Sequence, residues 1–267
     1  MTVKITTQGR VRIVMIHRPE ARNAVNPATA QALFDAFLAF QADETVDAAI
    51  LTGADGAFCA GFDLKAAADG GAADWIASLD IAQGWNDPMA DPKPGPMGPT
   101  RLMLSKPVIA AIEGPAVAGG MELAAWCDMR VMAQTAVMGV YCRRWGVPLI
   151  DGGTVRLPRL LGQGRANDLI LTGRSAAADE SLRIGLTDRT CPDGRALDTA
   201  LDLAQSLCGF PQGCMRADLL SARMAPADLA AGLRREWASA GTFGAEGQAG
   251  AARFAAGKGR SGDFSDI

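Results

Sequence analysis

A turn of small residues that leads directly into an apolar helix, at residues 114–128, constrains this chain more than any other segment. It reads Gly-Pro-Ala-Val-Ala-Gly-Gly-Met-Glu-Leu-Ala-Ala-Trp-Cys-Asp, and Glu122 falls in the first turn of the predicted helix. A helix start presents unpaired backbone N–H groups and the positive end of the helix dipole. Ala118, Gly119 and Gly120 have little or no side chain, so another group can approach the backbone closely. The segment therefore predicts a site for a developing negative charge, with a carboxylate beside it as acid or base.

A second turn of the same kind follows an earlier strand. The apolar strand predicted at 48–52 precedes the sequence Gly-Ala-Phe-Cys-Ala-Gly-Phe-Asp-Leu at 56–64, with small residues at Ala60 and Gly61. Two such turns can direct two N–H donors at one carbonyl oxygen, which is the arrangement called an oxyanion hole. Small-residue turns are also common structural devices, because glycine marks special backbone geometry. From spacing alone, both interpretations stay open.

The remaining chain alternates strands and helices and then becomes mostly helical, which indicates a β-rich core wound in repeating turns. Strands are predicted at 3–6, 11–16, 48–52, 108–112 and 129–133. Helices are predicted at 27–41, 118–126, 165–171, 178–184, 196–207, 215–224 and 226–240. Residues 84–99 contain five prolines and predict a loop, which is a lid, a pocket wall or a surface excursion. The Gly- and Ser-rich tail from residue 257 is expected to be frayed.

Composition excludes several classes of function. The net charge of −3 argues against a general electrostatic attraction to nucleic acid or to an anionic membrane. Neither a signal-peptide pattern nor an apolar run long enough to span a bilayer is present, so we expect a cytoplasmic protein. His17 is the only histidine, which excludes zinc sites built from several histidines, and it is expected simply to end a strand. The six scattered cysteines are expected to be buried thiols, and no metal or redox cofactor is predicted.

Four segments together resemble the crotonase superfamily, the enoyl-CoA hydratase/isomerase family, and the resemblance covers nearly the whole chain. They are Arg-Pro-Glu-Ala-Arg-Asn-Ala at 18–24, Leu-Thr-Gly at 51–53 with Ala-Phe-Cys-Ala-Gly-Phe-Asp-Leu at 57–64, the run from Lys106 to Asp128, and the block from Gly146 to Gly162. The resemblance implies an α/β fold, with a crotonase-like spiral of ββα turns at residues 1–195. It implies a C-terminal helical trimerisation region at residues 196–267, and thus a homotrimer or hexamer.

The resemblance also implies an acyl-CoA ligand and no other cofactor. The backbone N–H groups of Phe62 and Gly119 would bind the thioester oxygen, while a carboxylate moves the α-proton or a proton of water. The ring of Phe62 stands where the family commonly has a small residue, and it would narrow or redirect the acyl pocket. The residues that would contact CoA or the substrate are Arg22, Ala24, Ala60, Asp63, Leu64, Lys65 and Lys258. For Arg22 and Lys258, a solvated surface charge is the alternative.

The second carboxylate of the site departs from the family pattern. Family hydratases use two glutamates that hold one water, and Glu122 matches the first, whereas Cys142 stands at the second position. A thiol cannot act as a general base at neutral pH unless its pKa is strongly lowered. Asp151 is the expected substitute, either as a second carboxylate from another wall of the pocket or, alternatively, as an N-cap for a helix that begins near residue 152. Glu113 is expected to have a turn role.

These features favour an enzyme that hydrates a 2-enoyl-CoA through an enolate, with Glu122 as acid/base and Asp151 assisting. An enoyl-CoA isomerase needs only one carboxylate and is the close alternative. An acyl-CoA thioester hydrolase or decarboxylase also stays open, because an oxyanion hole stabilises any enolate or tetrahedral intermediate. Cys142 motivates a further alternative, a non-catalytic acyl-CoA-binding protein, against which Glu122 and the two turns argue.

Overall fold

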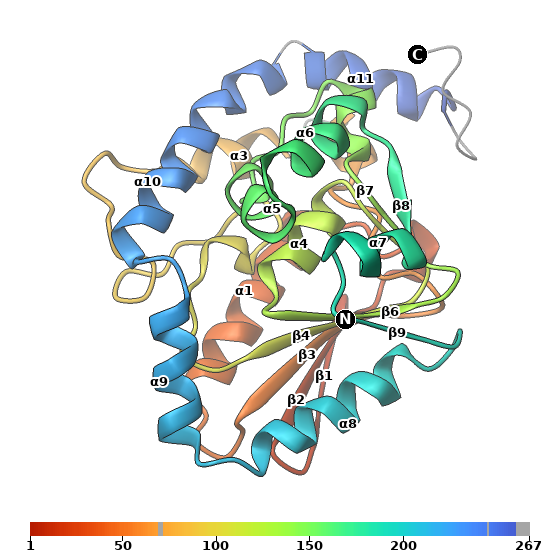
Figure 1. Ribbon diagram of the computed structural model, residues 1–267. Helices are drawn as coiled ribbons and strands as arrows, with labels where there is room; N and C mark the ends of the chain where they lie inside the picture. The colour runs from red at the N-terminus through yellow and green to blue at the C-terminus, as the bar shows by residue number, and fades with distance from the viewer. Residues whose placement is uncertain (69–71, 245, 260–267) are drawn as a thin grey trace.

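The computed structural model describes residues 1–68, 72–244 and 246–259, and these residues form a mixed α/β fold (Figure 1). One sheet has the strand order β1-β2-β3-β4-β6-β9 and is parallel apart from the β1–β2 hairpin; a smaller sheet has the order β5-β7-β8. The strands are β1 (Val3–Gln8), β2 (Val11–Ile16), β3 (Ala48–Gly53), β4 (Val108–Ile112), β5 (Pro115–Val117), β6 (Met129–Ala133), β7 (Val137–Gly139), β8 (Ser175–Ala177) and β9 (Arg189–Cys191).

Helices surround the two sheets and dominate the second half of the chain. The α-helices are α1 (Pro27–Ala42), α2 (Leu64–Ala68), α3 (Ala73–Ser78), α4 (Gly119–Trp126), α5 (Gly153–Leu161), α6 (Gln163–Thr172), α7 (Ala178–Ile184), α8 (Ala196–Cys208), α9 (Gln212–Ala222), α10 (Pro226–Trp237) and α11 (Glu246–Ala255). Short 3-10 segments are η1 (Pro19–Ala21), η2 (Pro99–Arg101), η3 (Tyr141–Trp145) and η4 (Ala238–Gly244). Within the described residues, none of these helices combines the length and apolar character that crossing a membrane requires. The predicted frayed tail lies mostly outside the described residues.

A repeating unit explains how the two sheets and the helices are connected. A strand of the large sheet is followed by a strand of the small sheet and then by a helix, as in β4-β5-α4 and in β6-β7-η3. An earlier turn runs from β3 through Cys59, which forms a parallel bridge with Ala116 in β5, to α2. The chain is therefore wound in ββα turns, which confirms the predicted α/β architecture with a helical C-terminal region.

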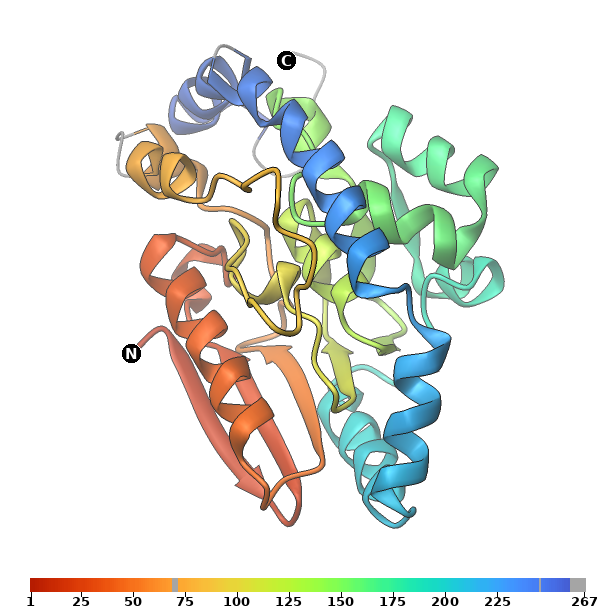
Figure 2. The same cartoon turned by 90° about the vertical axis from the view of Figure 1, so that its left-hand side faces the viewer.

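The inner strands of the large sheet, such as β3 and β4, are buried on both faces, and this accounts for their continuous apolar runs. In β3, Ala48 and Ile50 belong to the cluster that α8 covers, whereas Ala49 and Leu51 belong to the cluster that includes α1 and α4. This alternation follows from the two-residue period of a strand. Figure 2 shows α1 lying along the strands that begin the chain.

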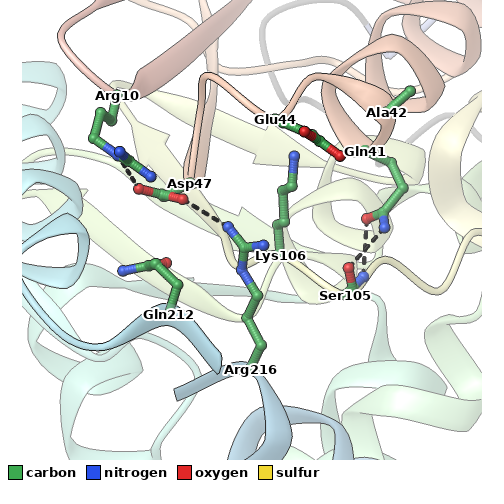
Figure 3. A pocket seen from close by; sticks show the side chains of 9 residues that line it. All are labelled: Arg10, Gln41, Ala42, Glu44, Asp47, Ser105, Lys106, Gln212 and Arg216. Carbon is green, nitrogen blue, oxygen red and sulfur yellow. Dashed lines mark hydrogen bonds and ion pairs between the residues drawn. The ribbon is translucent and has the colours of Figure 1, made fainter. Parts of the chain in front are cut away.

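The C-terminal helices follow the outside of the molecule, from α9 beside the large sheet through α10 to α11, which packs against α2 and η3 (Figure 1). Asp47, which is 2% exposed, ties α9 to the sheet, since it pairs with Arg10 and lies 2.7 Å from the guanidinium of Arg216 in α9. Figure 3 shows Asp47 between these two side chains, in a polar pocket that Lys106 also lines. Because α8 packs on the sheet itself, the domain boundary between residues 195 and 196 stays a prediction.

The packing of α4 against the Cys59 turn gives a stability prediction. A Cβ on Gly120 would overlap the carbonyl oxygen of Cys59 and lie 2.9 Å from its Cβ, whereas a Cβ on Gly164 in α6 would meet open space. We expect Gly120→Ala to lower the free energy of unfolding by about 1–3 kcal/mol, because backbone atoms cannot rotate away. Gly164→Ala should be neutral or stabilising by up to about 1 kcal/mol. Urea unfolding of both variants is the measurement, and equal stabilities would contradict the close packing.

Candidate active site

The two small-residue turns meet backbone to backbone. The Val117 N–H donates to the carbonyl of Cys59 at 3.0 Å. A Cβ on Gly61 would lie 2.8 Å from the Cβ of Ala118 and 3.1 Å from the nitrogen of Gly119, and Gly61 has a φ of +96°. Only glycine fits this position, both because of the contact and because of the backbone angle. The small residues seen in the sequence are thus explained by close approach of one turn to the other.

The backbone N–H groups of Phe62 and Gly119 have no acceptor within the described part of the chain. Val25 bonds to the residues on either side of Phe62: its N–H donates to Gly61 at 2.8 Å and its carbonyl accepts from Asp63 at 2.9 Å. This pairing turns the amide of Phe62 away from Val25. Gly119 is the first residue of α4, so its N–H has no partner in the helix. The structure therefore leaves two N–H donors on adjoining turns.

The backbone of Ala118, which lies between the end of β5 and Gly119, is strained. Its φ is 53° and its ψ is −127°, a conformation that residues with a Cβ rarely adopt. Such strain costs on the order of 1–3 kcal/mol and persists only where surrounding contacts impose it. Here the Ala118 N–H donates to Gly139 at 2.8 Å, and its carbonyl accepts from Met121 at 3.0 Å. The turn before α4 is held in one conformation.

Glu122 lies three residues after Gly119 in α4 and is 3% exposed. Its Oε1 accepts two backbone hydrogen bonds at 2.9 Å, from the N–H groups of Asp151 and Gly153 at the start of α5. Burial raises the pKa of Glu122 well above its ordinary value, and the neighbouring charges of Asp151 and Glu236 raise it further, while the two N–H donors oppose the rise. A carboxyl group with a raised pKa is suited to both accepting and donating a proton.

The side chain of Asp151 does not cap α5, so the N-cap interpretation is wrong. Gly152 is the N-cap residue, and the Asp151 carboxylate points elsewhere: Oδ1 accepts from the N–H of Met97 at 2.9 Å and from the hydroxyl of Thr100. Burial raises the pKa of Asp151 to about 6, although these donors and the nearby Arg101 and Arg156 limit the rise. Asp151 thus donates its backbone N–H to Glu122, while its side chain accepts from Met97, just before η2, and from Thr100 within η2.

The proline-rich segment ends in a buried wall of the site. Residues 95–101 are buried, and the backbones of Gly95 and Gly98 hydrogen-bond to each other at 2.8 and 2.9 Å. The side chain of Met97 packs against Gly119, because a Cβ added to Gly119 would lie 2.7 Å from the sulfur of Met97. Of the roles considered for residues 84–99, a surface excursion is wrong for residues 95–99, because this part is enclosed.

Glu236 is a site residue that sequence analysis missed. It lies near the end of α10, is 5% exposed, and accepts from the N–H of Gly152 at 2.5 Å and from the N–H and hydroxyl of Thr154 at 2.8 Å. The sequence feature that could have identified Glu236 is its helical spacing from Leu229 and Leu233, because the three residues lie on one buried stripe of α10. A carboxylate at a position of an apolar stripe needs a hydrogen-bonding partner inside the fold.

The residues predicted to contact CoA gather around the turn that carries Phe62. Ala60 donates its N–H to the carbonyl of Arg22 at 3.1 Å; Arg22 is exposed and Ala24 is buried beside it. The structure places Leu64 half-buried and Lys65 exposed at the start of α2, and Lys258 exposed beyond α11, a helix that packs against α2.

Asp63 has a structural use in this turn. One oxygen accepts from the N–H of Lys65 at 3.1 Å, at the start of α2, and the other lies 3.0 Å from the guanidinium of Arg18. The pocket of Figure 3 lies where β3 and β4 begin, with Asp47 and Lys106 in its lining, and none of the predicted site residues lines it.

Cys142 and Glu113 have the environments of structural residues. Cys142 is buried in η3, and burial together with the charge of Glu122 raises the pKa of its thiol, so it stays protonated at neutral pH. Glu113 accepts from the N–H groups of Gly194 and Ala196 at the start of α8, which agrees with its predicted turn role. All six cysteines are free; Cys208 is partly exposed and Cys214 exposed, in contrast to the expectation of burial. Within the described residues, no group of three or more His, Cys, Asp or Glu side chains is arranged to hold a metal ion.

Comparison with known proteins decides the family. The model of the enoyl-CoA hydratase/isomerase family matches residues 6–236. The chain belongs to the enoyl-CoA hydratase/isomerase family. It is 36% identical over 226 residues to enoyl-CoA hydratase EchA19 of Mycobacterium tuberculosis, a match that covers 82% of this chain and 79% of the relative. It is 38% identical over 208 residues to carnitinyl-CoA dehydratase of Salmonella arizonae, with 77% and 74% covered.

A solved structure of the enoyl-CoA hydratase/isomerase fold gives the same result in three dimensions. The crystal structure of carnitinyl-CoA hydratase from Mycobacterium avium matches with a TM-score of 0.82 and 30% identity, covering 96% of each chain. The predicted crotonase-like α/β fold is thereby confirmed, as is the prediction that the chain is an enzyme of this family.

The buried carboxyl group of Asp151 predicts a pH-dependent stability. Its pKa is about 6 in the folded protein and would return to about 4 on unfolding, so the native state binds more protons between these values. Its contribution to stability is therefore present below about pH 4 and is lost as the pH rises to about 6, by on the order of 1–3 kcal/mol. Asp151→Asn should remove this part of the slope in urea unfolding. Identical slopes for the variant and the wild type would contradict the assignment.

Proposed function

We propose that the protein adds water to the C2=C3 double bond of a 2-enoyl-CoA, as a hydratase-type lyase. The observation that carries this proposal is the position of Glu122, a buried carboxylate fixed by two N–H groups and three residues from the free N–H of Gly119. Relatives named as an enoyl-CoA hydratase and a carnitinyl-CoA dehydratase support the same class of reaction.

In the proposed mechanism, the thioester oxygen accepts hydrogen bonds from the N–H groups of Phe62 and Gly119. When the oxygen of water bonds to C3, the electron pair of the double bond moves toward C2 and the thioester oxygen, giving an enolate. The two N–H donors stabilise that charge because they are already oriented and need no rearrangement. Glu122 takes the proton that water loses and delivers a proton to C2, which regenerates its carboxylate. Asp151 assists as the second carboxylate.

The CoA moiety, in this proposal, extends along the turn and the start of α2. Ala60, Leu64 and Lys65 lie along its path, and Arg22 and Ala24 adjoin them. Asp63 shapes the turn through its hydrogen bonds, and Lys258 approaches from the chain end. The half-buried ring of Phe62 packs on the core, and with Met97 it would limit the space for the acyl group.

Several broader properties belong to the same proposal. No cofactor is needed besides the coenzyme A of the substrate, since the polarisation of the thioester comes from backbone N–H groups. The protein acts on a small-molecule acyl-CoA rather than on nucleic acid or a membrane, and the net charge of −3 supports this. We further propose a cytoplasmic location and a homotrimer or hexamer, as the resemblance to the family implies.

One observation favours isomerisation as a second candidate function. The thiol of Cys142 stays protonated, so it cannot supply the second base that a two-glutamate hydratase uses. An enoyl-CoA isomerase removes a proton from C2 of a 3-enoyl-CoA and returns one to C4, which a single carboxylate such as Glu122 can perform. Direct assay of a 3-enoyl-CoA beside a 2-enoyl-CoA separates the two activities.

Replacing Glu122 tests the proposed acid/base. Glu122→Gln keeps an oxygen that can accept the N–H groups of Asp151 and Gly153 but cannot take a proton. We expect kcat for crotonyl-CoA hydration, followed as loss of the conjugated-thioester absorbance, to fall about 10²- to 10⁴-fold. Glu180→Gln, the same change in the ion pair with Arg174 at half-buried Glu180 of α7, is the matched control and should leave kcat unchanged. Full activity of Glu122→Gln would refute the assignment.

Replacing Asp151 tests the second carboxylate separately. In Asp151→Asn the amide oxygen can still accept from Met97 and Thr100, so the buried wall should keep its position. We expect kcat for hydration to fall about 10- to 100-fold, within the range of a lost proton-transfer group. A wild-type rate of hydration in this variant would show that Asp151 takes no part in proton transfer.

A further inference from the structure

The start of α5 divides its free N–H groups between two carboxylates. Among residues 151–154, the first and third N–H groups donate to Oε1 of Glu122, each at 2.9 Å. The second and fourth donate to the two oxygens of Glu236, at 2.5 and 2.8 Å. The N–H groups of residues 151–154 are thus satisfied, in alternation, by one carboxylate from α4 and one from α10. Three of them, those of Gly152, Gly153 and Thr154, are among the donors that a helix start leaves unpaired.

Glu236 reaches this position from the C-terminal region. The two helices α10 and α5 pack against each other, with Leu229 and Leu233 of α10 and Val155 of α5 in one buried cluster (Figure 2). Both carboxylate oxygens of Glu236 are used, and Oε1 also accepts the hydroxyl of Thr154 at 2.8 Å. Within the described residues, every hydrogen bond of the Glu236 carboxylate therefore goes to the start of α5.

We propose that Glu236 is a positioning residue for Glu122: by holding the N–H groups of Gly152 and Thr154, it fixes the start of α5 so that the N–H groups on either side of Gly152 are aimed at one oxygen of Glu122. The inference rests on the proposed acid/base role of Glu122. Without Glu236, two buried N–H groups would lose their acceptor and would compete for Glu122, because unsatisfied buried donors are costly.

The charge of Glu236 also acts on Glu122. It raises the pKa of Glu122, as does the carboxylate of Asp151. The cations near the carboxylate of Glu236 are Arg156 of α5 and Arg101 of η2. Burial raises the pKa of Glu236, and Arg156 opposes this rise. Glu236 therefore affects both the direction in which Glu122 is held and its affinity for a proton. Through it, α10 is mechanically connected to the proton-transfer group.

The test compares variants that separate charge from hydrogen bonding. Glu236→Gln removes the charge. It also places the NH₂ group of the amide, which is a donor, against the N–H donor of either Gly152 or Thr154, so that one of these hydrogen bonds is lost. We expect kcat for crotonyl-CoA to fall about 10- to 100-fold with KM changed less than about 2-fold, because Glu122 is misaligned. The acid limb of the kcat profile should move to lower pH, because Glu122 loses a negative neighbour. Thr154→Val removes only the hydroxyl donor and should leave that limb in place.

Glu180→Gln, at a half-buried glutamate of α7 that pairs with Arg174, is the control for charge removal and should change neither kcat nor the pH profile. A folded Glu236→Gln protein with wild-type kcat and an unmoved acid limb would overturn the proposal. If Glu236→Gln does not fold, Glu236→Asp, which keeps both oxygens and the charge, replaces it. We then expect a lowered kcat with the acid limb retained, and a wild-type kcat would overturn the proposal.

A second measurement does not depend on turnover and so separates this inference from the proposed function. The carboxyl carbons of the seven glutamates are labelled with ¹³C, and the Glu122 signal is assigned by its loss in Glu122→Gln. The titration midpoint of this signal should be lower in Glu236→Gln than in the wild type. An unchanged midpoint would overturn the inference even if hydration is found, whereas a lowered midpoint would support it even if the substrate is not an enoyl-CoA.

Discussion

The site depends on the buried amino terminus of α5. The positive end of the helix dipole lies at a largely buried helix start, and the carboxylates of Glu122 and Glu236 accept from the N–H groups of all four residues from 151 to 154. The same bonds make it possible to bury the carboxylates, since an isolated buried charge would be very costly. One helix start thereby fixes α4 and α10 together and leaves Glu122 as a buried carboxyl group with a raised pKa beside the Gly119 turn.

The second constraint is the contact between the turns that carry Phe62 and Gly119. The Gly61 and Gly120 positions have no room for a Cβ, and Ala118 is held at a positive φ. In the proposed function, the two N–H donors on these adjoining turns form a preorganised site for negative charge, and such a site is worth more where water is excluded. Met97, held by Asp151, closes this site on one side, so the donors and the carboxylates form one connected structure.

Much of this arrangement could be predicted from the sequence because it is local. The inner strands of the large sheet are visible in the sequence as apolar runs. Gly61 and Gly119 can be identified because close approach of two backbones demands small residues, and Glu122 because it is the carboxylate in the first turn of the following helix. What sequence could not give is the pairing of distant segments: Glu236 caps a helix 84 positions earlier in the chain. The sequence also could not decide which acid caps α5. Asp151 directly precedes the N-cap residue, but its side chain bonds to Met97 and Thr100 and does not cap α5.

Above all, we propose that Glu122 transfers the C2 proton of an acyl-CoA whose enolate is stabilised at the two turns. Exchange of the C2 proton with solvent measures this transfer without requiring a double bond in the substrate. The enzyme is incubated with butyryl-CoA in D₂O, and deuterium at C2 is followed by mass spectrometry while binding is confirmed by calorimetry. The wild type should exchange the C2 protons, and Glu122→Gln should do so at least about 10²-fold more slowly. Equal exchange by the two proteins, or binding without exchange in the wild type, would contradict the account.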